Sequence, residues 1–353
     1  KTEKFRIGLT RDFLTPGGGL AIGDNALRLL EKETRVSYKF FPKLSSEISP
    51  DQIAGYDAII PLAPQITRNT LSKGNLELSV VARCGVGYDN VDVKALTQQN
   101  CILTIAPDAV RRPVATGIIT LILALTHELL AKDRLVRDGR WQDRHQIRAR
   151  GLSGRILGSI GIGNIGKELF RLIRPFEMVH IATDPLVNPG EIADLRVDLV
   201  DLETLMRQSD FVCINCPLTT KTRGMIGERE LGWMKQTAYF INTSRGPIVD
   251  QDALYRIVKE RRIRGAALDV FSAEPLPDNN PLTKLDNVIL TPHSICWTDE
   301  CFQAMGDSAA RSVLAIFSGQ VPESVVNPEV LKKPEMIRKL KENSQRWESL
   351  GPD

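Results

Sequence analysis

The chain has 353 residues, of which 42% are hydrophobic and 25% are charged, and its formal net charge is +3. This length and composition are those of a globular protein with room for two domains, each with its own core. The near-neutral charge argues against a nucleic-acid-binding protein. The longest apolar run, 117–125, is well short of the roughly 20 residues that cross a bilayer. The chain opens on a strand-like segment, 5–9, without a signal peptide pattern, so we expect a cytoplasmic protein.

Six cysteines in a chain of this length do not form a disulfide framework. Cys213 and Cys216 make a C-x-x-C pair, a spacing that also occurs in metal and redox sites. The pair lies in an apolar strand and its exit, 211–217, and no second C-x-x-C follows. We interpret it as a buried strand end, predict no metal site, and expect a reducing compartment.

The first hundred residues alternate strand-like and helix-like segments. Strands are predicted at 5–10, 35–41, 57–62, 78–84 and 101–105. Helices are predicted at 24–33 and 91–98. Alternation of this kind predicts a parallel sheet covered on both faces. A long helix is predicted next, from Pro113, which suits a first helical turn, to Arg137, and the polar segment 141–151 is interpreted as a linker.

A second alternating series begins at Gly154. Its strands are predicted at 156–161, 178–183, 211–215, 238–242, 266–270 and 287–291. Its helices are predicted at 164–174, 202–208 and 250–261. Six strands in this order are what a complete dinucleotide-binding unit requires. We expect the helix predicted at 299–317 to pack on the first domain, and the charged segment 332–353 to be helical or loose.

The strongest local motif is Gly161-Ile162-Gly163-Asn164-Ile165-Gly166, a G-x-G-x-x-G between a predicted strand and a predicted helix. Gly161 permits a tight turn, Gly163 lets the backbone approach a pyrophosphate, and Gly166 lets helix and strand pack closely. The N-terminus of the following helix would offer N–H groups to the phosphates. Asp184 follows the next strand, where a carboxylate accepts hydrogen bonds from a ribose 2′-OH and repels a 2′-phosphate. The motif therefore predicts NAD over NADP.

Three charged side chains follow predicted strands in the last third of the chain: Arg245, Glu274 and His293. The carboxyl ends of parallel strands share the edge at which open α/β sheets bind ligands, so we expect these side chains to meet there. Arginine matches a carboxylate bidentately and histidine transfers protons near neutral pH, so the set indicates work on a carboxylate-bearing carbonyl compound. Taken alone, each of these three residues could also be purely structural. We interpret the other histidines of the chain as structural: His127, His145 and His180.

These residues form part of a series of motifs that resembles the D-isomer-specific 2-hydroxyacid dehydrogenase family. The series covers nearly the whole chain, from Cys84-Gly85-Val86-Gly87-Tyr88-Asp89-Asn90-Val91-Asp92 to Val326-Asn327-Pro328. Between these ends lie Gly151-Leu152-Ser153-Gly154-Arg155, the glycine loop, and Cys216-Pro217-Leu218-Thr219 with Thr222. Several motifs in the family's order are far more specific than any one of them.

The resemblance implies an α/β fold of two domains, with a Rossmann dinucleotide-binding domain inserted in a flavodoxin-like parallel-sheet substrate domain. We expect the substrate domain at 1–112 and 295–330, and the NAD-binding domain, with its long linking helix, at 113–294. A charged C-terminal tail would occupy 331–353. The active site is expected in the cleft between the domains, which substrate binding would draw together.

The resemblance also implies a role for each motif residue. Arg245 would bind the substrate carboxylate and polarise the carbonyl, His293 would donate and accept the proton, and Glu274 would orient His293. Backbone N–H groups of Gly85, Val86 and Gly87 would bind the substrate carboxylate, with a plain tight turn as the alternative. NAD would contact the following set: Gly161, Gly163, Asn164, Ile165, Gly166, Asp184, Cys216, Pro217, Thr222, Thr243, Ser244 and Asp269.

The chain departs from the family at the start of the long helix. Many members have Val-Ala-Glu there, whereas this chain has Val114-Ala115-Thr116-Gly117 after Arg111 and Arg112. The two arginines either select a second anionic group on the substrate or form a solvated helix start.

Three other features narrow the substrate. Segment 61–65 lacks the arginine that phosphoglycerate dehydrogenases place nearby, and no regulatory domain follows residue 330, which argues against a phosphorylated substrate. Glu274 stands where formate dehydrogenases carry Gln, which argues against formate. We therefore expect a short 2-keto acid such as glyoxylate or hydroxypyruvate.

The resemblance implies a homodimer, which would form through the long helix and the arm around Trp141. We expect no nucleic-acid or membrane partner. Two alternatives stay open. One is an NAD(H)-sensing regulatory protein of the corepressor type on the same scaffold. The other is an oxidoreductase on that scaffold that acts on a different anion, such as phosphite.

Overall fold

The structure is a computed structural model that describes residues 3–15, 17–20, 24–73 and 77–351. The chain divides into two compact units, each built on its own parallel sheet. The first unit comprises 1–110 and 297–353, and the second comprises 111–296, so the divisions fall beside the predicted boundaries at 112 and 295. The predicted α/β class with two parallel-sheet domains is confirmed.

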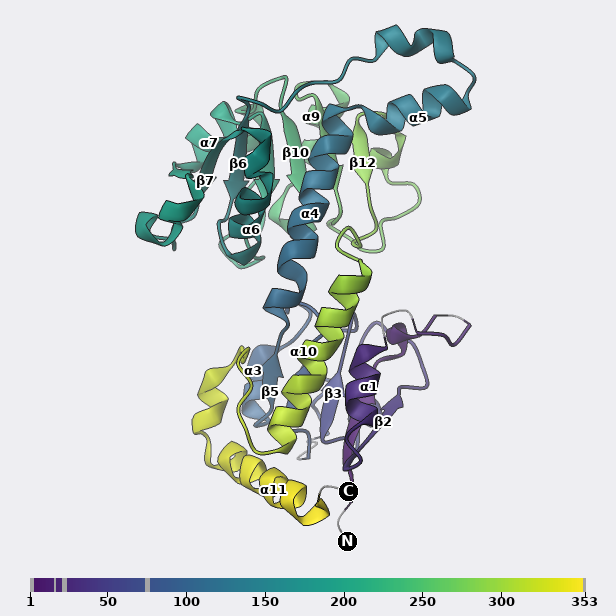
Figure 1. Cartoon of the computed structure of the whole chain (residues 1–353), viewed down its shortest axis with the longest axis vertical. Coiled ribbons are helices and arrows are strands. Elements are labelled where there is room, and N and C mark those ends of the chain that lie inside the picture. Colours follow the sequence, from purple (N-terminus) through teal and green to yellow (C-terminus); the bar gives the residue numbers. More distant parts are fainter. Residues whose placement is uncertain (1–2, 16, 21–23, 74–76, 352–353) are drawn as a thin grey trace. The chain divides into compact units, whose positions relative to one another are not determined.

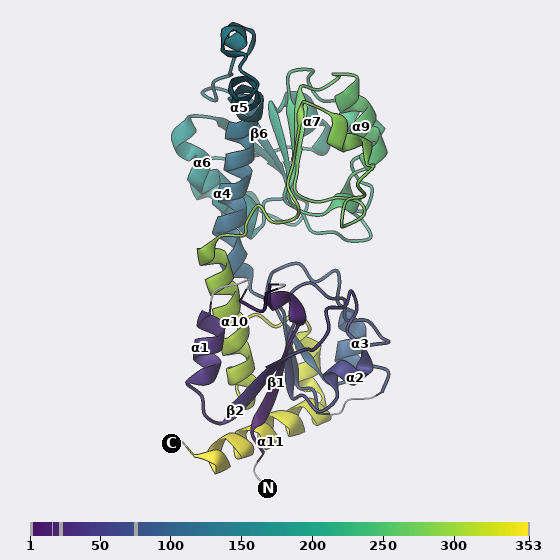
Figure 2. The ribbon, with the colours of Figure 1, turned by 90° about the vertical axis from the view of Figure 1, so that its right-hand side faces the viewer.

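The first unit is built on a five-stranded parallel sheet with the order β2-β1-β3-β4-β5. Its strands are β1 (Phe5–Leu9), β2 (Val36–Phe40), β3 (Ala58–Ile60), β4 (Val80–Ala82) and β5 (Ile102–Thr104). This is the flavodoxin order that the resemblance implies. Helices α1 (Asn25–Glu31) and α10 (Asp299–Phe317) cover one face of the sheet, and α2 (Pro50–Ile53) and α3 (Val93–Gln98) cover the other (Figure 2). The central strands are apolar throughout because both faces are covered.

The charged segment after residue 331 is helical and packs within the first unit. It forms α11 (Pro334–Leu350), drawn in yellow in Figure 1. The Nζ of Lys339 donates to the carbonyl oxygens of Leu78 at 2.8 Å and Asn100 at 3.1 Å, and burial lowers the pKa of Lys339. The Nη1 of Arg346 donates to Asp57 at 2.8 Å. The charges of this segment therefore attach it to the sheet.

The second unit is built on a seven-stranded parallel sheet with the order β12-β11-β10-β9-β6-β7-β8. Its strands are β6 (Ile156–Ile160), β7 (Val179–Thr183), β8 (Asp198–Leu199), β9 (Phe211–Ile214), β10 (Tyr239–Asn242), β11 (Gly265–Leu268) and β12 (Val288–Leu290). This is the Rossmann order with one further strand at the β12 edge. The prediction of six strands missed β8, because two residues leave no hydrophobic pattern.

Helices cover both faces of this second sheet. Helices α4 (Pro107–Thr126) and α6 (Asn164–Ile173) lie on one face, and α7 (Leu202–Gln208) and α9 (Gln251–Lys259) lie on the other (Figure 2). The short α8 (Glu228–Gly232) packs against α9. A core of buried residues, among them Leu205, Phe240 and Ile257, fills the space between the sheet and α7–α9.

The long helix predicted from Pro113 to Arg137 is two helices in the structure. Helix α4 begins at Pro107, so Pro113 lies inside it and not in its first turn. The chain then turns at Glu128, whose φ of 52° is left-handed, and α5 (Leu129–Arg137) follows. The hydrophobic pattern continues across the turn, so periodicity alone did not reveal the break.

Helix α4 is also longer than its apolar run suggested. Within the described part of the chain it is the one helix whose length and apolar composition would suffice to cross a membrane. Of its most apolar window, 56% is buried in the protein. A buried core helix of an ordinary globular protein has the same pattern.

Candidate active site

The glycine loop of the second unit joins β6 to α6 with very little space around two of its glycines. Gly161 has a φ of 95°, and a Cβ built on it would lie 2.7 Å from the backbone of Asn215 and Cys216. A Cβ on Gly166 would lie 2.8 Å from the carbonyl oxygen of Gly161. Gly163, at the N-terminus of α6, has open space where its Cβ would be. Two glycines thus close the turn, and the third leaves room for a ligand.

Asp184 lies beside this loop, after β7. One carboxylate oxygen accepts a hydrogen bond from the N–H of Ile162 at 3.0 Å, and the other accepts one from the N–H of Leu186 at 3.0 Å. Both contacts fix the carboxylate next to the turn that would hold the phosphates. The structure therefore brings the predicted ribose and phosphate contacts together.

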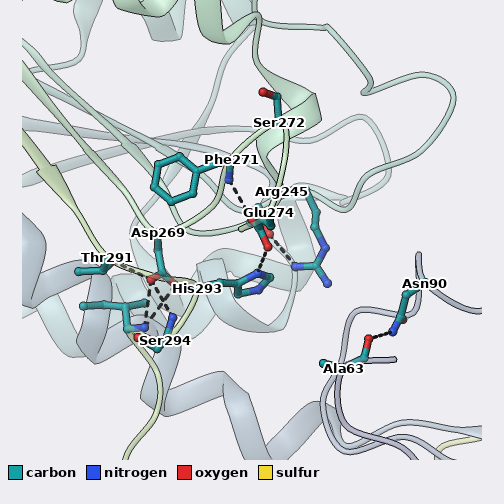
Figure 3. A network of polar contacts seen from close by, with 12 residues as sticks. Ala63, Asn90, Arg245, Asp269, Phe271, Ser272, Glu274, Thr291, His293 and Ser294 are labelled. Carbon is teal, nitrogen blue, oxygen red and sulfur yellow. Dashed lines mark hydrogen bonds and ion pairs between the residues drawn. The ribbon is translucent and has the colours of Figure 1, made fainter. Parts of the chain in front are cut away.

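The three predicted catalytic side chains gather in the second unit (Figure 3). The Nδ1 of His293 lies 2.7 Å from a carboxylate oxygen of Glu274, and the other oxygen of Glu274 accepts from the N–H of Phe271 at 2.9 Å. Arg245 donates to the carbonyl oxygen of Ser244 at 2.6 Å and lies close enough to Glu274 to stabilise its charge. Side chains that are distant in the sequence thus meet at one edge of the sheet.

The charge state of Glu274 follows from these contacts. Burial favours the neutral acid, but hydrogen bonds from His293 and Phe271, together with the nearby positive charge of Arg245, outweigh it and lower the pKa of Glu274. The carboxylate is therefore ionised at neutral pH and keeps a proton on the Nδ1 of His293. The Nε2 atom is then the ring nitrogen left to face a ligand, and proton exchange at that atom stays a prediction.

Asp269 organises the loop that carries His293. It directly follows Leu268, the last residue of β11, whereas the strand predicted at 266–270 included it. Its Oδ1 accepts hydrogen bonds from the hydroxyl of Thr291 at 2.6 Å and from the N–H groups of Ser294 at 2.9 Å and Ile295 at 3.1 Å (Figure 3). Burial raises the pKa of Asp269 against the effect of these hydrogen bonds. The buried carboxylate is thus paired, as its burial requires.

Comparison with known proteins identifies the family. The family model described as "D-isomer specific 2-hydroxyacid dehydrogenase, NAD binding domain" matches residues 119–294. A glyoxylate reductase of Korarchaeum cryptofilum is 37% identical over 291 residues, which are 82% of this chain and 88% of the relative. The chain belongs to the D-isomer-specific 2-hydroxyacid dehydrogenase family. It is an NAD-dependent oxidoreductase that acts on CH–OH groups.

Two other members of this dehydrogenase family show the range of relatives. A D-3-phosphoglycerate dehydrogenase of Methanocaldococcus jannaschii is 36% identical over 331 residues, which are 93% of this chain but 62% of that longer relative. The crystal structure of a D-lactate dehydrogenase from Aquifex aeolicus, complexed with NAD and lactic acid, superposes with a TM-score of 0.79 at 26% identity. That superposition covers 91% of this chain and 98% of the other.

The loops around the glycine turn fit the NAD that the dehydrogenase uses. The hydroxyl of Thr222 donates to the carbonyl of Pro217 at 2.6 Å, and that of Ser244 donates to Ile214 at 2.8 Å. The Thr243 hydroxyl and the Asn215 side-chain oxygen are buried and have no hydrogen-bond partner among the described residues. Unpaired polar atoms of this kind are costly unless a ligand meets them. Cofactor contacts by these residues, and by Asn164 and Ile165 in the first turn of α6, stay predictions.

Cys213 and Cys216, the C-x-x-C pair, lie in a buried strand and at its exit, as the sequence predicted. Cys213 is fully buried in β9 and Cys216 lies at its exit. Burial raises the pKa of the Cys216 thiol to about 11 and that of Cys213 further. Both are therefore thiols at neutral pH, a poor state for metal binding or redox exchange.

The predicted carboxylate-binding loop lies in the first unit, after β4. Gly85 has a φ of 134°, and its carbonyl oxygen accepts from the N–H of Ala106 at 2.9 Å. Sequence reasoning missed Arg83, whose Nη1 donates to the carbonyl of Cys84 at 3.0 Å and lies where a Cβ of Gly85 would be. An arginine two residues before the first glycine of the turn was the available signal. The meeting of Gly85, Val86 and Gly87 with Arg245 and His293 stays a prediction.

Arg111 and Arg112, predicted at a helix start, lie in the second turn of α4, and the structure accounts for them differently. Arg112 forms an ion pair with Glu168 of α6 at 3.3 Å, and its side chain is 63% exposed. This placement favours the solvated helix start for Arg112. A substrate contact by Arg111 stays a prediction.

Proposed function

We propose that this dehydrogenase reduces a small, non-phosphorylated 2-keto acid of the glyoxylate or hydroxypyruvate kind, with NADH as the reductant. The observation that carries the proposal is the pairing of His293 with Glu274 beside Arg245. The glyoxylate reductases among the relatives, at 32–38% identity, support the substrate class.

Each residue has a distinct part in the proposed reaction. Arg245 binds the substrate carboxylate, and its positive charge stabilises the negative charge that grows on the carbonyl oxygen. NADH supplies the hydride to C2 when it is bound. The imidazolium of His293 donates its Nε2 proton to the carbonyl oxygen, and the Glu274 carboxylate stabilises the imidazolium until that transfer. In the reverse direction His293 accepts the hydroxyl proton.

The test is NADH oxidation by the wild-type enzyme with a panel of 2-keto acids. We expect turnover with glyoxylate or hydroxypyruvate that exceeds turnover with phosphohydroxypyruvate. Faster turnover of the phosphorylated acid would contradict the proposed substrate class. Tight NADH binding without turnover of any 2-keto acid would favour the regulatory alternative. Reduction of NAD+ by phosphite, without turnover of any 2-keto acid, would favour the oxidoreductase that acts on a different anion.

We also propose that the enzyme is a homodimer. The arm of α5 and the turn after it carries large apolar side chains that are more than half exposed: Leu129, Leu130, Val136 and Trp141. Apolar side chains gathered on one protruding element favour a protein contact. Multi-angle light scattering of the purified enzyme should give twice the chain mass of 39.2 kDa. A monomer mass at micromolar concentration would contradict the dimer.

A further inference from the structure

Gly117, in the middle of α4, leaves no room for a side chain. A Cβ built on Gly117 would lie 2.8 Å from Cγ1 and 3.2 Å from Cγ2 of Ile295, and 3.1 Å from the Ile295 carbonyl oxygen. Its backbone is ordinary helix, so the left-handed conformation that favours glycine elsewhere is no reason for it. Glycine inside a helix costs about 1 kcal/mol relative to alanine. The close approach of Ile295 is the feature that explains this glycine.

Ile295 is two residues beyond His293. The same segment is also held by Asp269, which accepts hydrogen bonds from the N–H groups of Ser294 and Ile295 and from the hydroxyl of Thr291. The segment 291–295 is therefore held by a buried carboxylate and also lies against the backbone of α4 at Gly117. Neither contact touches the imidazole itself.

His293 needs such support. Its φ of 52° is left-handed, a conformation that costs a non-glycine residue about 1–3 kcal/mol and persists only where the surroundings impose it. The conformation directs the imidazole to Glu274 at 2.7 Å, a contact that weakens steeply as distance and angle change. A shift of a few tenths of an ångström at Ile295 would be passed to the imidazole, because only Ser294 separates the two residues.

We propose that Gly117 is a positioning residue for the proton-transfer step. Its missing side chain lets the Ile295 segment lie against α4, and this contact sets where the His293 imidazole stands. Gly117 acts through Ile295 and is not itself catalytic. The inference rests on the proposed function only in taking His293 as the proton donor.

The test is the substitution Gly117→Ala, with Thr120→Ala as the matched control. Thr120 is exposed on the same helix, and its hydroxyl bonds only to the Thr116 carbonyl in the described structure. Misplacement of a reacting group by about 1 Å can cost as much as 10²-fold in rate. We expect Gly117→Ala to lower kcat about tenfold or more and to leave the NADH dissociation constant unchanged. Thr120→Ala should retain wild-type kcat.

A double variant separates positioning from loss of folding. Ile295→Ala removes both side-chain atoms that the new methyl group would strike and leaves only the carbonyl oxygen at 3.1 Å, so Gly117→Ala with Ile295→Ala should recover part of the lost kcat. Wild-type kcat in Gly117→Ala would overturn the inference. So would loss of NADH binding together with kcat, or a double variant as slow as Gly117→Ala alone.

A spectroscopic measurement distinguishes failure of this inference from failure of the proposed function. The His293 Nδ1 proton, hydrogen-bonded to Glu274, should give a downfield resonance in the imidazole ¹⁵N–H spectrum that is absent in His293→Ala. Gly117→Ala should move this resonance upfield, whether or not any 2-keto acid is turned over. An unmoved resonance would overturn the inference. A moved resonance in an enzyme without turnover would contradict the proposed function and leave the positioning role supported.

Discussion

At the scale of single residues, the site contains two carboxylates, Glu274 and Asp269, whose surroundings shift their pKa values in opposite directions. Glu274 is about one-third exposed, yet two hydrogen-bond donors and a nearby arginine keep its pKa low. Asp269, fully buried a few residues away, has a raised pKa although it accepts hydrogen bonds from three donor groups. The two carboxylates therefore have different contacts: Glu274 pairs with the imidazole of His293, and Asp269 holds the loop that carries it.

Replacing Glu274 by Gln should slow catalysis without weakening cofactor binding. Glutamine can occupy the same place but has no negative charge to stabilise an imidazolium. The value of kcat should therefore fall, by up to the roughly 10²–10⁴-fold expected for loss of a general acid. Stopped-flow NADH oxidation and NADH fluorescence titration would measure the two quantities. An unchanged kcat would remove Glu274 from the proposed mechanism.

The lowered pKa of Glu274 also predicts how its effect on stability depends on pH. Because the folded-state pKa lies below the unfolded value of about 4.3, the ionised side chain stabilises the fold above that value. This contribution is lost as the pH falls through the lower folded-state pKa. In urea unfolding at about pH 7, the free energy of unfolding should therefore be larger for wild type than for Glu274→Gln, and this difference should shrink below about pH 4. A difference that grows in acid would contradict a lowered pKa of Glu274 in the folded state.

The fixed carboxylate of Asp184 predicts the nucleotide preference. Asp184→Ala should raise the KM for NADH about tenfold or more, as expected for loss of hydrogen bonds to a charged group worth ~1.5–3 kcal/mol. Loss of the negative charge of Asp184 should also reduce the preference for NADH over NADPH, because the carboxylate would no longer repel the 2′-phosphate. Asp194→Ala, an exposed carboxylate paired only with Arg171 in the described structure, is the control. Equal KM values in wild type and Asp184→Ala would contradict the ribose contact.

Most of the candidate site was predictable at this scale, because Arg245, Glu274 and His293 each follow a strand whose apolar pattern is plain. What could not be predicted was the set of contacts around them. Sequence gave no sign that Ile295 lies against Gly117 or that Asp269 pairs with Thr291, since those partners are far apart along the chain.

At the scale of elements, the turn from β6 to α6 separates two uses of glycine. Gly161 has a left-handed φ and backbone atoms where its Cβ would be, whereas Gly163 has neither. The geometry gives Gly161 a structural role in the turn and leaves Gly163 facing open space, in line with the two roles expected from the motif.

The pair of substitutions Gly161→Ala and Gly163→Ala should therefore give different results. Gly161→Ala should destabilise the apoprotein by at least ~1–3 kcal/mol through backbone strain. Gly163→Ala should leave the apoprotein Tm unchanged but weaken NADH binding, because a methyl group would stand between the backbone and the pyrophosphate. Thermal melts with and without NADH measure both effects. Equal losses of Tm in the two apoproteins would contradict the assignment.

Element existence was predicted better than element boundaries. The strands of both sheets were found where β-branched and aliphatic residues run together, with the exception of the two-residue β8. The break between α4 and α5 was missed because Glu128 is a poor signal for a left-handed turn, which glycine or asparagine usually marks.

At the scale of the whole molecule, the C-terminal segment belongs to the fold of the first unit. Sequence indicated a charged helix or a loose tail, because lysine and arginine usually lie in solvent. The structure instead buries Lys339 at the amino end of the sheet, where the backbone carbonyls of Leu78 and Asn100 accept hydrogen bonds from its Nζ. Only the three-dimensional position of those carbonyls makes this burial favourable.

Lys339→Met should accordingly destabilise the first unit. The substitution retains most of the side-chain volume but leaves buried carbonyls unpaired, at a cost of ~1–3 kcal/mol. Lys341→Met, an exposed position on the same helix, should be near neutral. Urea unfolding followed by circular dichroism compares the two, and equal stability of both variants would show that α11 is attached to the sheet by other contacts.

The proposed mechanism assigns proton transfer to His293 in a reaction driven by NADH. Single-turnover reduction of glyoxylate by the NADH-loaded enzyme measures this step, with His145→Ala, a substitution of an exposed histidine far along the chain, as control. We expect His293→Ala to lower the rate of NADH oxidation by about 10²–10⁴-fold at unchanged NADH affinity, and His145→Ala to keep the wild-type rate. A His293→Ala enzyme that oxidises NADH at the wild-type rate would contradict the proton-transfer role of His293.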